Sequence, residues 1–141
     1  MNRTLLIILT AVLTSQSLIA AEYLIVSKKN AEAQTIDKDI VRDIYLGSKL
    51  FWKDGSRIHP VHLPITDKTF NHFVEEVIQM DTSQFLSYWR RKLFSGRAHP
   101  PKQIKKIEEI IKFVEDHPDS IAILPLSPKN ISEHITVIEL D

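Results

Sequence analysis

The sequence predicts one small α/β domain that contains parallel strand pairs. Short apolar runs typical of buried strands alternate with stretches in which apolar residues recur at helical spacing. Such alternation favours a sandwich of helices and strands over an all-helical or all-strand fold. No internal repeat or low-complexity linker divides the chain. Without its leader the chain has roughly 120 residues, a length that suits a single core.

The first 21 residues have the layout of a secretory signal peptide. Their one charge, Arg3, precedes the apolar run Leu5 to Leu13 and a polar tail of small residues. The run is shorter than the roughly 20 apolar residues of a membrane-spanning helix, which makes a retained anchor the minority alternative. We therefore expect cleavage after Ala20 or Ala21, export to the periplasm, and a domain formed by residues 22–141.

Composition excludes several classes of protein. Removing Arg3 from the 18 Lys and Arg leaves 17 against 18 Asp and Glu, so no strongly basic field indicates nucleic-acid binding. The absence of cysteine excludes a disulfide, a thiolate nucleophile and a thiolate metal site. It also excludes a lipid on an N-terminal cysteine. The core must come from the apolar residues, which make up 43% of the chain.

The first half of the domain reads as strand, helix and strand. The apolar run "EYLIVS" at 22–27 predicts a buried strand, and the polar stretch 28–35 follows it. A helix then begins at the cap Asp37 and ends at Gly47. Its apolar face is formed by Ile40, Val41, Ile44 and Tyr45.

A turn at Asp54-Gly55 introduces the second strand, Arg57 to Leu63. Pro60 cannot donate a backbone hydrogen bond, so it shortens this strand or places it at the sheet edge.

The second half begins with two helices. From Thr66 the apolar residues repeat at offsets typical of a helix face: Phe70, Phe73, Val74, Val77 and Ile78. Asp81-Thr82 closes this helix and caps another. The second helix should direct inward Phe85, Leu86, Trp89 and Leu93. It breaks at Gly96 and cannot resume before Pro101.

A further helix and two strands complete the prediction. The helix stops at His117-Pro118 and is marked by Ile104, Ile107, Ile110, Ile111 and Val114. Two short strands follow, Ser120 to Leu124 and Ile135 to Leu140.

Six histidines raise the question of a metal site, and their spacing argues against one. His59 and His62 are three apart on a predicted strand, so they should point to opposite faces. His72 lies five residues beyond Asp67, a poor match to helical spacing. The histidines left over, His99, His117 and His134, fall in loops or at element ends, where solvated side chains are the rule. We expect no metal and no cofactor.

No constellation of residues indicates catalysis. The chain has no Gly-x-Ser-x-Gly or comparable nucleophile signature. The adjacent carboxylates Glu75-Glu76 and Glu108-Glu109 face different directions on helices, unlike a general acid and base. Trp52 and Trp89 suit the core better than a ligand stack. We therefore expect a protein that is not an enzyme.

Two regions could hold an anion. Residues Thr66 to Thr69 form a turn into a helix, where unpaired N–H groups can hold phosphate or sulfate, with hydroxyls from Thr66 and Thr69 and a charge from Lys68. Asp67 competes, because its carboxylate can accept the same N–H groups; from the residues alone an ordinary cap is favoured over an anion site. The second region, Arg90 to Arg97, places cations near a helix end. The helix dipole favours cations there without any ligand, although an anion or a protein partner is the alternative.

Three segments together resemble the short periplasmic phosphate ABC transporter substrate-binding proteins, single-domain relatives of the type II periplasmic binding fold. They are "IDKDIVRDIYLGSKLFWKDGSRIHPV", "FVEEVIQMDTSQFLSYWRRKLFSGRAHPP" and "IIKFVEDHPDSIAIL". The resemblance implies one α/β lobe with a small mixed sheet flanked by helices, location in the periplasm, and a phosphate-like ligand in the full-length members. It places Thr66, Asp67, Lys68 and Thr69 at the ligand loop, to which we add Arg97.

The departures from that family concern the ligand. Full-length members have two lobes and carry a Ser-Gly-Thr-Thr-like loop where this chain has Ile65 to Thr69 without glycine. Glycine there would let backbone N–H groups approach an anion closely. Two hypotheses follow: a solute-binding-like domain that binds phosphate or another small anion weakly, with an ABC permease as a partner; or an accessory module of the envelope that has lost its ligand and binds a protein through the segment Trp89 to Arg97.

Overall fold

The computed structural model describes residues 23–28, 35–96, 98–126 and 131–141. The predicted signal peptide, residues 1–21, and the candidate ligand residue Arg97 lie outside these ranges. The helices are α1 (Lys38–Tyr45), α2 (Lys68–Phe73), η1 (Val74–Ile78), α3 (Thr82–Phe94) and α4 (Ile107–Asp116). The strands are β1 (Tyr23–Ser27), β2 (Thr35–Ile36), β3 (His59–His62), β4 (Lys102–Gln103), β5 (Ser120–Pro125) and β6 (Thr136–Leu140).

The strands form one mixed sheet in the order β2-β6-β1-β5-β3-β4. Strand β1 runs antiparallel to both of its neighbours, β5 and β6. Three pairs are parallel: β2 with β6, β3 with β4, and β3 with β5. The predicted α/β domain with parallel pairs is thereby confirmed.

Pro60 has the effect on β3 that its chemistry requires. The strand is shorter than the predicted Arg57 to Leu63, and Pro60 pairs with Ile121 of β5 on one side only. On the other side β4 pairs with the two residues beyond it, Val61 and His62. Of the two predicted effects of Pro60, the shortening is therefore confirmed, whereas β3 is not the edge strand because the two-residue strand β4 covers it.

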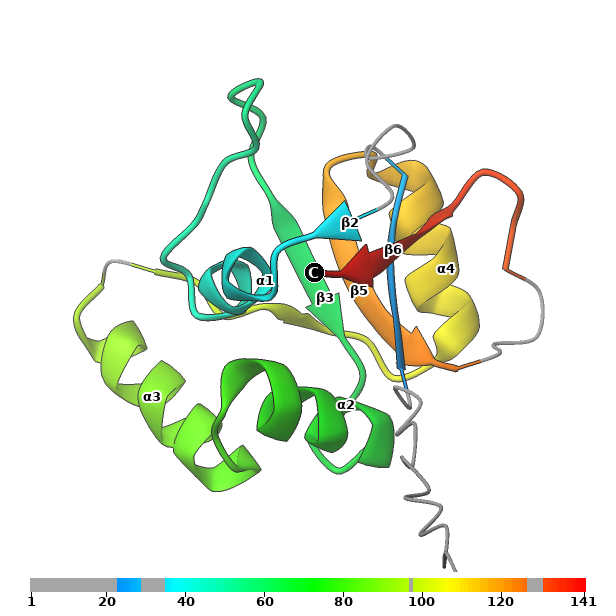
Figure 1. Ribbon diagram of the computed structural model, residues 1–141. Helices are drawn as coiled ribbons and strands as arrows, with labels where there is room; N and C mark the ends of the chain where they lie inside the picture. The colour runs from blue at the N-terminus through cyan, green and yellow to red at the C-terminus, as the bar shows by residue number, and fades with distance from the viewer. Residues whose placement is uncertain (1–22, 29–34, 97, 127–130) are drawn as a thin grey trace, which may run out of the picture.

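Helices cover both faces of the sheet. Helix α4 packs on one face and α1 with α2 on the other, whereas α3 lies farther out (Figure 1). Strand β5 shows the consequence, since its residues from Ser120 to Leu124 are all buried. A strand that is enclosed on both faces needs apolar side chains at successive positions, and Ile121 to Leu124 form such a run.

Helix α1 begins and ends as predicted. The Asp37 carboxylate accepts the backbone N–H of Asp39 at 2.7 Å, which caps the first turn. At the other end Gly47 adopts φ +68°, a left-handed conformation that glycine enters without steric cost. The Tyr45 hydroxyl, fully buried, donates to the carbonyls of Val61 at 2.8 Å and Ile121 at 3.3 Å, which fixes α1 against the sheet.

Helix α2 continues without interruption into the π-helix η1. Its predicted apolar face is confirmed, because every member is at most 1% exposed: Phe70, Phe73, Val74, Val77 and Ile78. The π-helix ends at Gln79, a non-glycine residue with φ +60°. Asp81 then caps α3 in a capping box with Gln84, as the Asp81-Thr82 pair predicted.

Two predicted core residues of α3 are exposed instead. Leu86 is 37% and Leu93 is 48% exposed, whereas Phe85 and Trp89 are buried as expected. The reason is that α3 packs on η1 and on the end of α1 rather than on the sheet. A narrow contact of that kind covers only one stripe of the helix.

Candidate functional site

The predicted anion residues Thr66 to Thr69 form one continuous turn at the carboxyl end of β3. The chain leaves β3 at His62, and the Asp67 N–H donates to the Pro64 carbonyl at 2.8 Å. Thr66 and Lys68 are exposed, and Thr69 is half-buried. This β3–α2 turn thus presents two hydroxyls and an ammonium group next to the start of a helix.

Asp67 occupies the N–H groups that an anion would use. Its Oδ1 accepts the N–H of Thr69 at 2.9 Å and that of Phe70 at 3.2 Å. The carboxylate therefore caps α2 and neutralises the positive end of the helix dipole. An anion at this turn must compete with Asp67 for both donors.

A buried histidine lies beneath the turn and was not predicted as part of it. His62 is 5% exposed, and its ring stacks on Phe70 with 4.1 Å between centroids. Its Nδ1 contacts the Leu63 carbonyl, and burial lowers the pKa of the ring below its ordinary value. A neutral His62 gives this turn an apolar floor and no positive charge. The His59 ring lies 6.5 Å from that of His117, at the end of α4, whereas His62 stacks on Phe70 of α2, which confirms that the two histidines point to opposite sides of β3.

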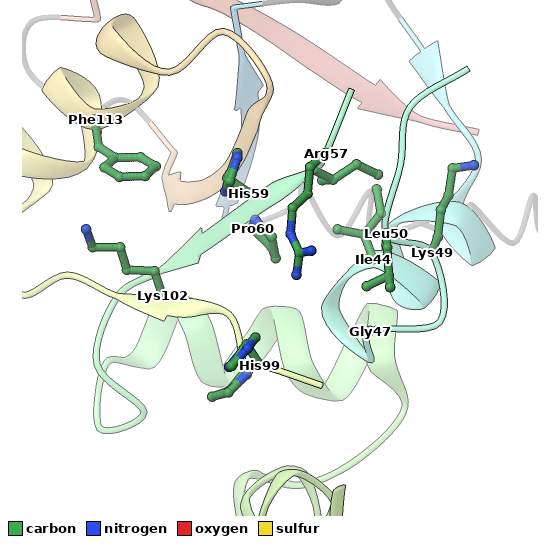
Figure 2. Close-up of a pocket in the computed structure, with 12 residues that line it drawn as sticks. Ile44, Gly47, Lys49, Leu50, Arg57, His59, Pro60, His99, Lys102 and Phe113 are labelled. Carbon is green, nitrogen blue, oxygen red and sulfur yellow. The ribbon is translucent and has the colours of Figure 1, made fainter. Parts of the chain in front are cut away.

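A basic pocket lies at the other end of β3. Its cavity of about 130 Å³ is bounded by the loop after α1, by β3 and β4, and by Phe113 of α4 (Figure 2). The charged and titratable side chains of its lining are all cationic or imidazole groups: Lys49, Arg57, His59, His99 and Lys102. Sequence spacing gave no sign of this pocket, because the parallel pairing of β3 with β4 brings its halves together.

The cationic segment of α3 divides into bonded and free side chains. The Lys92 ammonium donates to the Leu46 carbonyl at 2.6 Å and to the Tyr88 hydroxyl at 2.9 Å. Arg90 and Arg91 are exposed and, within the described part of the chain, form no ion pair. Lys92 therefore helps to hold α3 on the domain, whereas the two arginines face solvent.

Neither a metal site nor a membrane span is found in the described ranges. No group of three or more His, Asp or Glu side chains there could hold a metal ion. No helix there is long and apolar enough to cross a bilayer.

Solved structures with the same fold include three phosphate-transport proteins. A Clostridium perfringens phosphate ABC transporter substrate-binding protein with bound phosphate superposes with a TM-score of 0.63 at 14% identity, over 84% of this chain and 44% of that one. PstS from Borrelia burgdorferi gives a TM-score of 0.64 at 14% identity, over 85% and 47%. A Vibrio cholerae ABC-type phosphate transport receptor gives 0.60 at 10% identity, over 84% and 46%.

The domain is periplasmic-binding-protein-like in fold. This confirms the fold expected from the sequence resemblance. At such low identities the likeness concerns the fold alone, and the binding-protein-like domain spans less than half the length of these solved proteins. No protein-family description and no curated protein sequence matches the chain.

Proposed function

We propose that this chain is an exported, periplasmic solute-binding-like domain that binds phosphate or another small anion weakly at the β3–α2 turn. The observation that supports the proposal is the position of Thr66 to Thr69, at the carboxyl end of a parallel strand and at a helix start. In α/β folds ligands bind at such positions, beyond the carboxyl ends of strands. The fold is shared with phosphate-transport proteins, one of them solved with phosphate.

The residues have separate roles in this proposal. The exposed Lys68 ammonium supplies charge, and the hydroxyls of Thr66 and Thr69 donate hydrogen bonds to the anion oxygens. Arg97, which lies outside the described residues, is a further candidate ligand. Asp67 makes the site weak, since it holds the N–H groups of Thr69 and Phe70. Binding of this kind needs no reaction and no cofactor.

Calorimetric titration of the chain from Glu22 with inorganic phosphate tests the proposal. We expect a millimolar dissociation constant that the double substitution Thr66→Ala with Thr69→Ala weakens at least tenfold. The matched control is Thr136→Ala, which removes a half-buried threonine hydroxyl from β6, a strand that is not adjacent to β3. The absence of heat at millimolar phosphate would refute the proposal.

Export is tested separately, by fractionating cells that express the whole chain. The periplasmic fraction should contain a form whose intact mass corresponds to a chain that begins at Ala21 or Glu22. A full-length, membrane-bound form would instead support the retained anchor.

The exposed side of α3 supports a second candidate function, that of an accessory module which binds an envelope protein. Leu86, Leu93 and Phe94 lie on one side of the helix, and Phe94 is 88% exposed. Arg90 lies on the same side, next to Arg91. The α3 sequence "TSQFLSYWRRKLF" contains no carboxylate. Apolar and cationic groups without acids suit a partner surface that is acidic and apolar.

Photo-crosslinking from position 94 in the cell envelope tests this second function. We expect an adduct with an acidic protein, identified by mass spectrometry, that disappears with Arg90→Glu and Arg91→Glu. The control, Lys112→Glu on α4, exchanges an exposed cation elsewhere and should leave the adduct intact. An adduct with a second copy of the chain, or one that survives both arginine substitutions, would refute an acidic partner.

A further inference from the structure

The basic pocket is separate from the β3–α2 turn. The pocket contains His59, which begins β3, whereas the turn follows His62, which ends it. The last β3 residue in the pocket lining is Pro60, and Thr66, the first candidate residue of the turn, comes six positions later in the chain. The pocket lining and the turn share no residue.

The lining of the pocket combines several positive groups with no negative one. Its polar members include Arg57, Lys102 and His99, and none of the lining residues is an aspartate or a glutamate. Within the described residues neither Arg57 nor Lys102 forms an ion pair. Cations gathered in a concave surface without counter-charges create a local positive potential that attracts anions.

The side chains come from separate segments, and Arg57 and His99 face a common space, whereas Lys102 extends toward Phe113. Figure 2 shows the Arg57 guanidinium extending into the gap that His99 faces, and Lys102 at the side where Phe113 lies. The Lys102 ammonium lies 4.6 Å from the centre of the Phe113 ring, which holds the lysine at the pocket wall. Lys49 points away from the others, so it contributes charge rather than a direct contact.

Size and wall chemistry limit the ligand. The cavity of about 130 Å³ has the volume of about four water molecules, since one water takes about 30 Å³ in the liquid. It therefore suits a small ligand. Apolar side chains of Ile44, Leu50 and Phe113 complete the wall. A planar guanidinium together with an ammonium and imidazoles provides donors in several directions, which match a tetrahedral phosphate group.

We propose that the basic pocket is a second, independent binding site, which takes a small compound carrying a phosphate group. Arg57 binds two phosphate oxygens through its fork of N–H donors, His99 contacts a third, and Lys102 adds positive charge from the wall beside Phe113. The neighbouring apolar wall accepts a short carbon chain when the phosphate is esterified. This site does not involve Thr66, Lys68 or the cap Asp67.

Titrations of the chain from Glu22 with inorganic phosphate and with glycerol 3-phosphate test the proposal. Backbone amide shifts followed by NMR should change at residues 49–60 and 99–103 with both ligands, and the ester should bind more tightly if the carbon chain uses the apolar wall. Tighter binding of inorganic phosphate would assign the site to the free anion. We expect Arg57→Gln to weaken binding at this site at least tenfold, and Lys102→Gln to weaken it less.

Two controls separate this site from others. Lys53→Gln removes an exposed cation from the same loop but outside the pocket lining, and it should leave the affinity unchanged. The double substitution Thr66→Ala with Thr69→Ala should also leave this site intact, so a failure of the β3–α2 turn to bind is distinguishable from a failure here. Shifts confined to residues 64–70, an unchanged affinity in folded Arg57→Gln, or no shifts with either ligand at 10 mM would each refute the proposal.

Discussion

Removing Asp67 should strengthen phosphate binding at the β3–α2 turn. Two substitutions separate the two effects of this carboxylate. Asp67→Asn removes the charge while its amide oxygen can still accept the N–H groups of Thr69 and Phe70. Asp67→Gly removes the charge and also frees both donors. Glycine is tolerated as a helix cap, at a cost of only a few tenths of a kcal/mol relative to the usual capping residues.

The magnitudes follow from the distances in the cap. A phosphate that approaches the two donors would place a negative oxygen about 4 Å from the carboxylate, where repulsion is about 1 kcal/mol in water. Relief of that repulsion should improve the affinity about fivefold in Asp67→Asn. The donors now bound at 2.9 and 3.2 Å by Oδ1 would each add about 1 kcal/mol once released. With the relieved repulsion this amounts to about 3 kcal/mol, so Asp67→Gly should bind phosphate roughly 100-fold to 200-fold more tightly than the unchanged chain.

The assay is calorimetry with inorganic phosphate at low ionic strength, because screening by salt weakens the repulsion being measured. The order of affinity should be Asp67→Gly, then Asp67→Asn, then the unchanged chain. Asp37→Asn is the control, since Asp37 caps α1 through the same kind of hydrogen bond. Equal affinities for all four proteins, or weaker binding in Asp67→Gly, would show that the N–H groups at this turn do not contact the anion.

Four further substitutions test the packing and the pH dependence. Gly47→Ala should lower the free energy of unfolding by about 2–4 kcal/mol in urea titrations, because its Cβ would lie 2.8 Å from a Trp89 ring atom at φ +68°. Gly96→Ala, at φ +67° in open space, should cost only about 1–2 kcal/mol, and an equal loss would refute the steric argument. Tyr45→Phe should cost about 1–2 kcal/mol by thermal melting, since it removes a buried donor shared by two strand carbonyls, and an unchanged melting temperature would contradict this. Because the pKa of His62 is lowered in the folded protein, the unfolded chain binds a proton at this residue first as the pH falls below about 6.5. The free energy of unfolding should therefore decline from pH 7 to 5 more steeply in the unchanged chain than in His62→Gln. Parallel profiles would show that burial does not hold the ring neutral.

The parts of the fold that could be predicted are those in which local pattern and tertiary environment agree. The helix face from Phe70 to Ile78 is a strong example, because one continuous apolar stripe meets one continuous surface. The switch to π-helix geometry at Val74 could not be predicted, since a widened turn leaves the same apolar residues facing the core. Strands of two residues, such as β2 and β4, carry no periodicity that a sequence could display.

The error on α3 has a different physical origin. Hydrophobic spacing identifies which side of a helix is apolar but not how much of that side a neighbour covers. Phe85 and Trp89 are buried, whereas Leu86 and Leu93 extend beyond the contact. The excess of apolar residues over the covered stripe is what makes the outer side of α3 a candidate for a protein partner.

The two candidate binding regions differ in whether the local sequence reveals them. The β3–α2 turn could be predicted from the sequence because Thr66 to Thr69 are contiguous and precede a helix. The basic pocket could not, because Arg57 and Lys102 are far apart in the chain and line one pocket only through strand pairing. Proximity of that kind depends on the register of β3 and β4, in which Val61 lies opposite Lys102.

Local arrangement of charge also explains how the proposed anion sites can exist on a chain with no net charge. Equal numbers of acidic and basic residues, 18 of each, remove the long-range field that nucleic-acid binding requires. At physiological ionic strength, however, charges more than about 8 Å apart are largely screened, so a ligand responds to its immediate surroundings. The basic pocket has no carboxylate in its lining, and α3 has none in its sequence. Acidic residues such as Glu108 and Glu109 are placed elsewhere, in the first turn of α4. A small anion or an acidic protein surface therefore encounters a positive site on a molecule that is neutral as a whole.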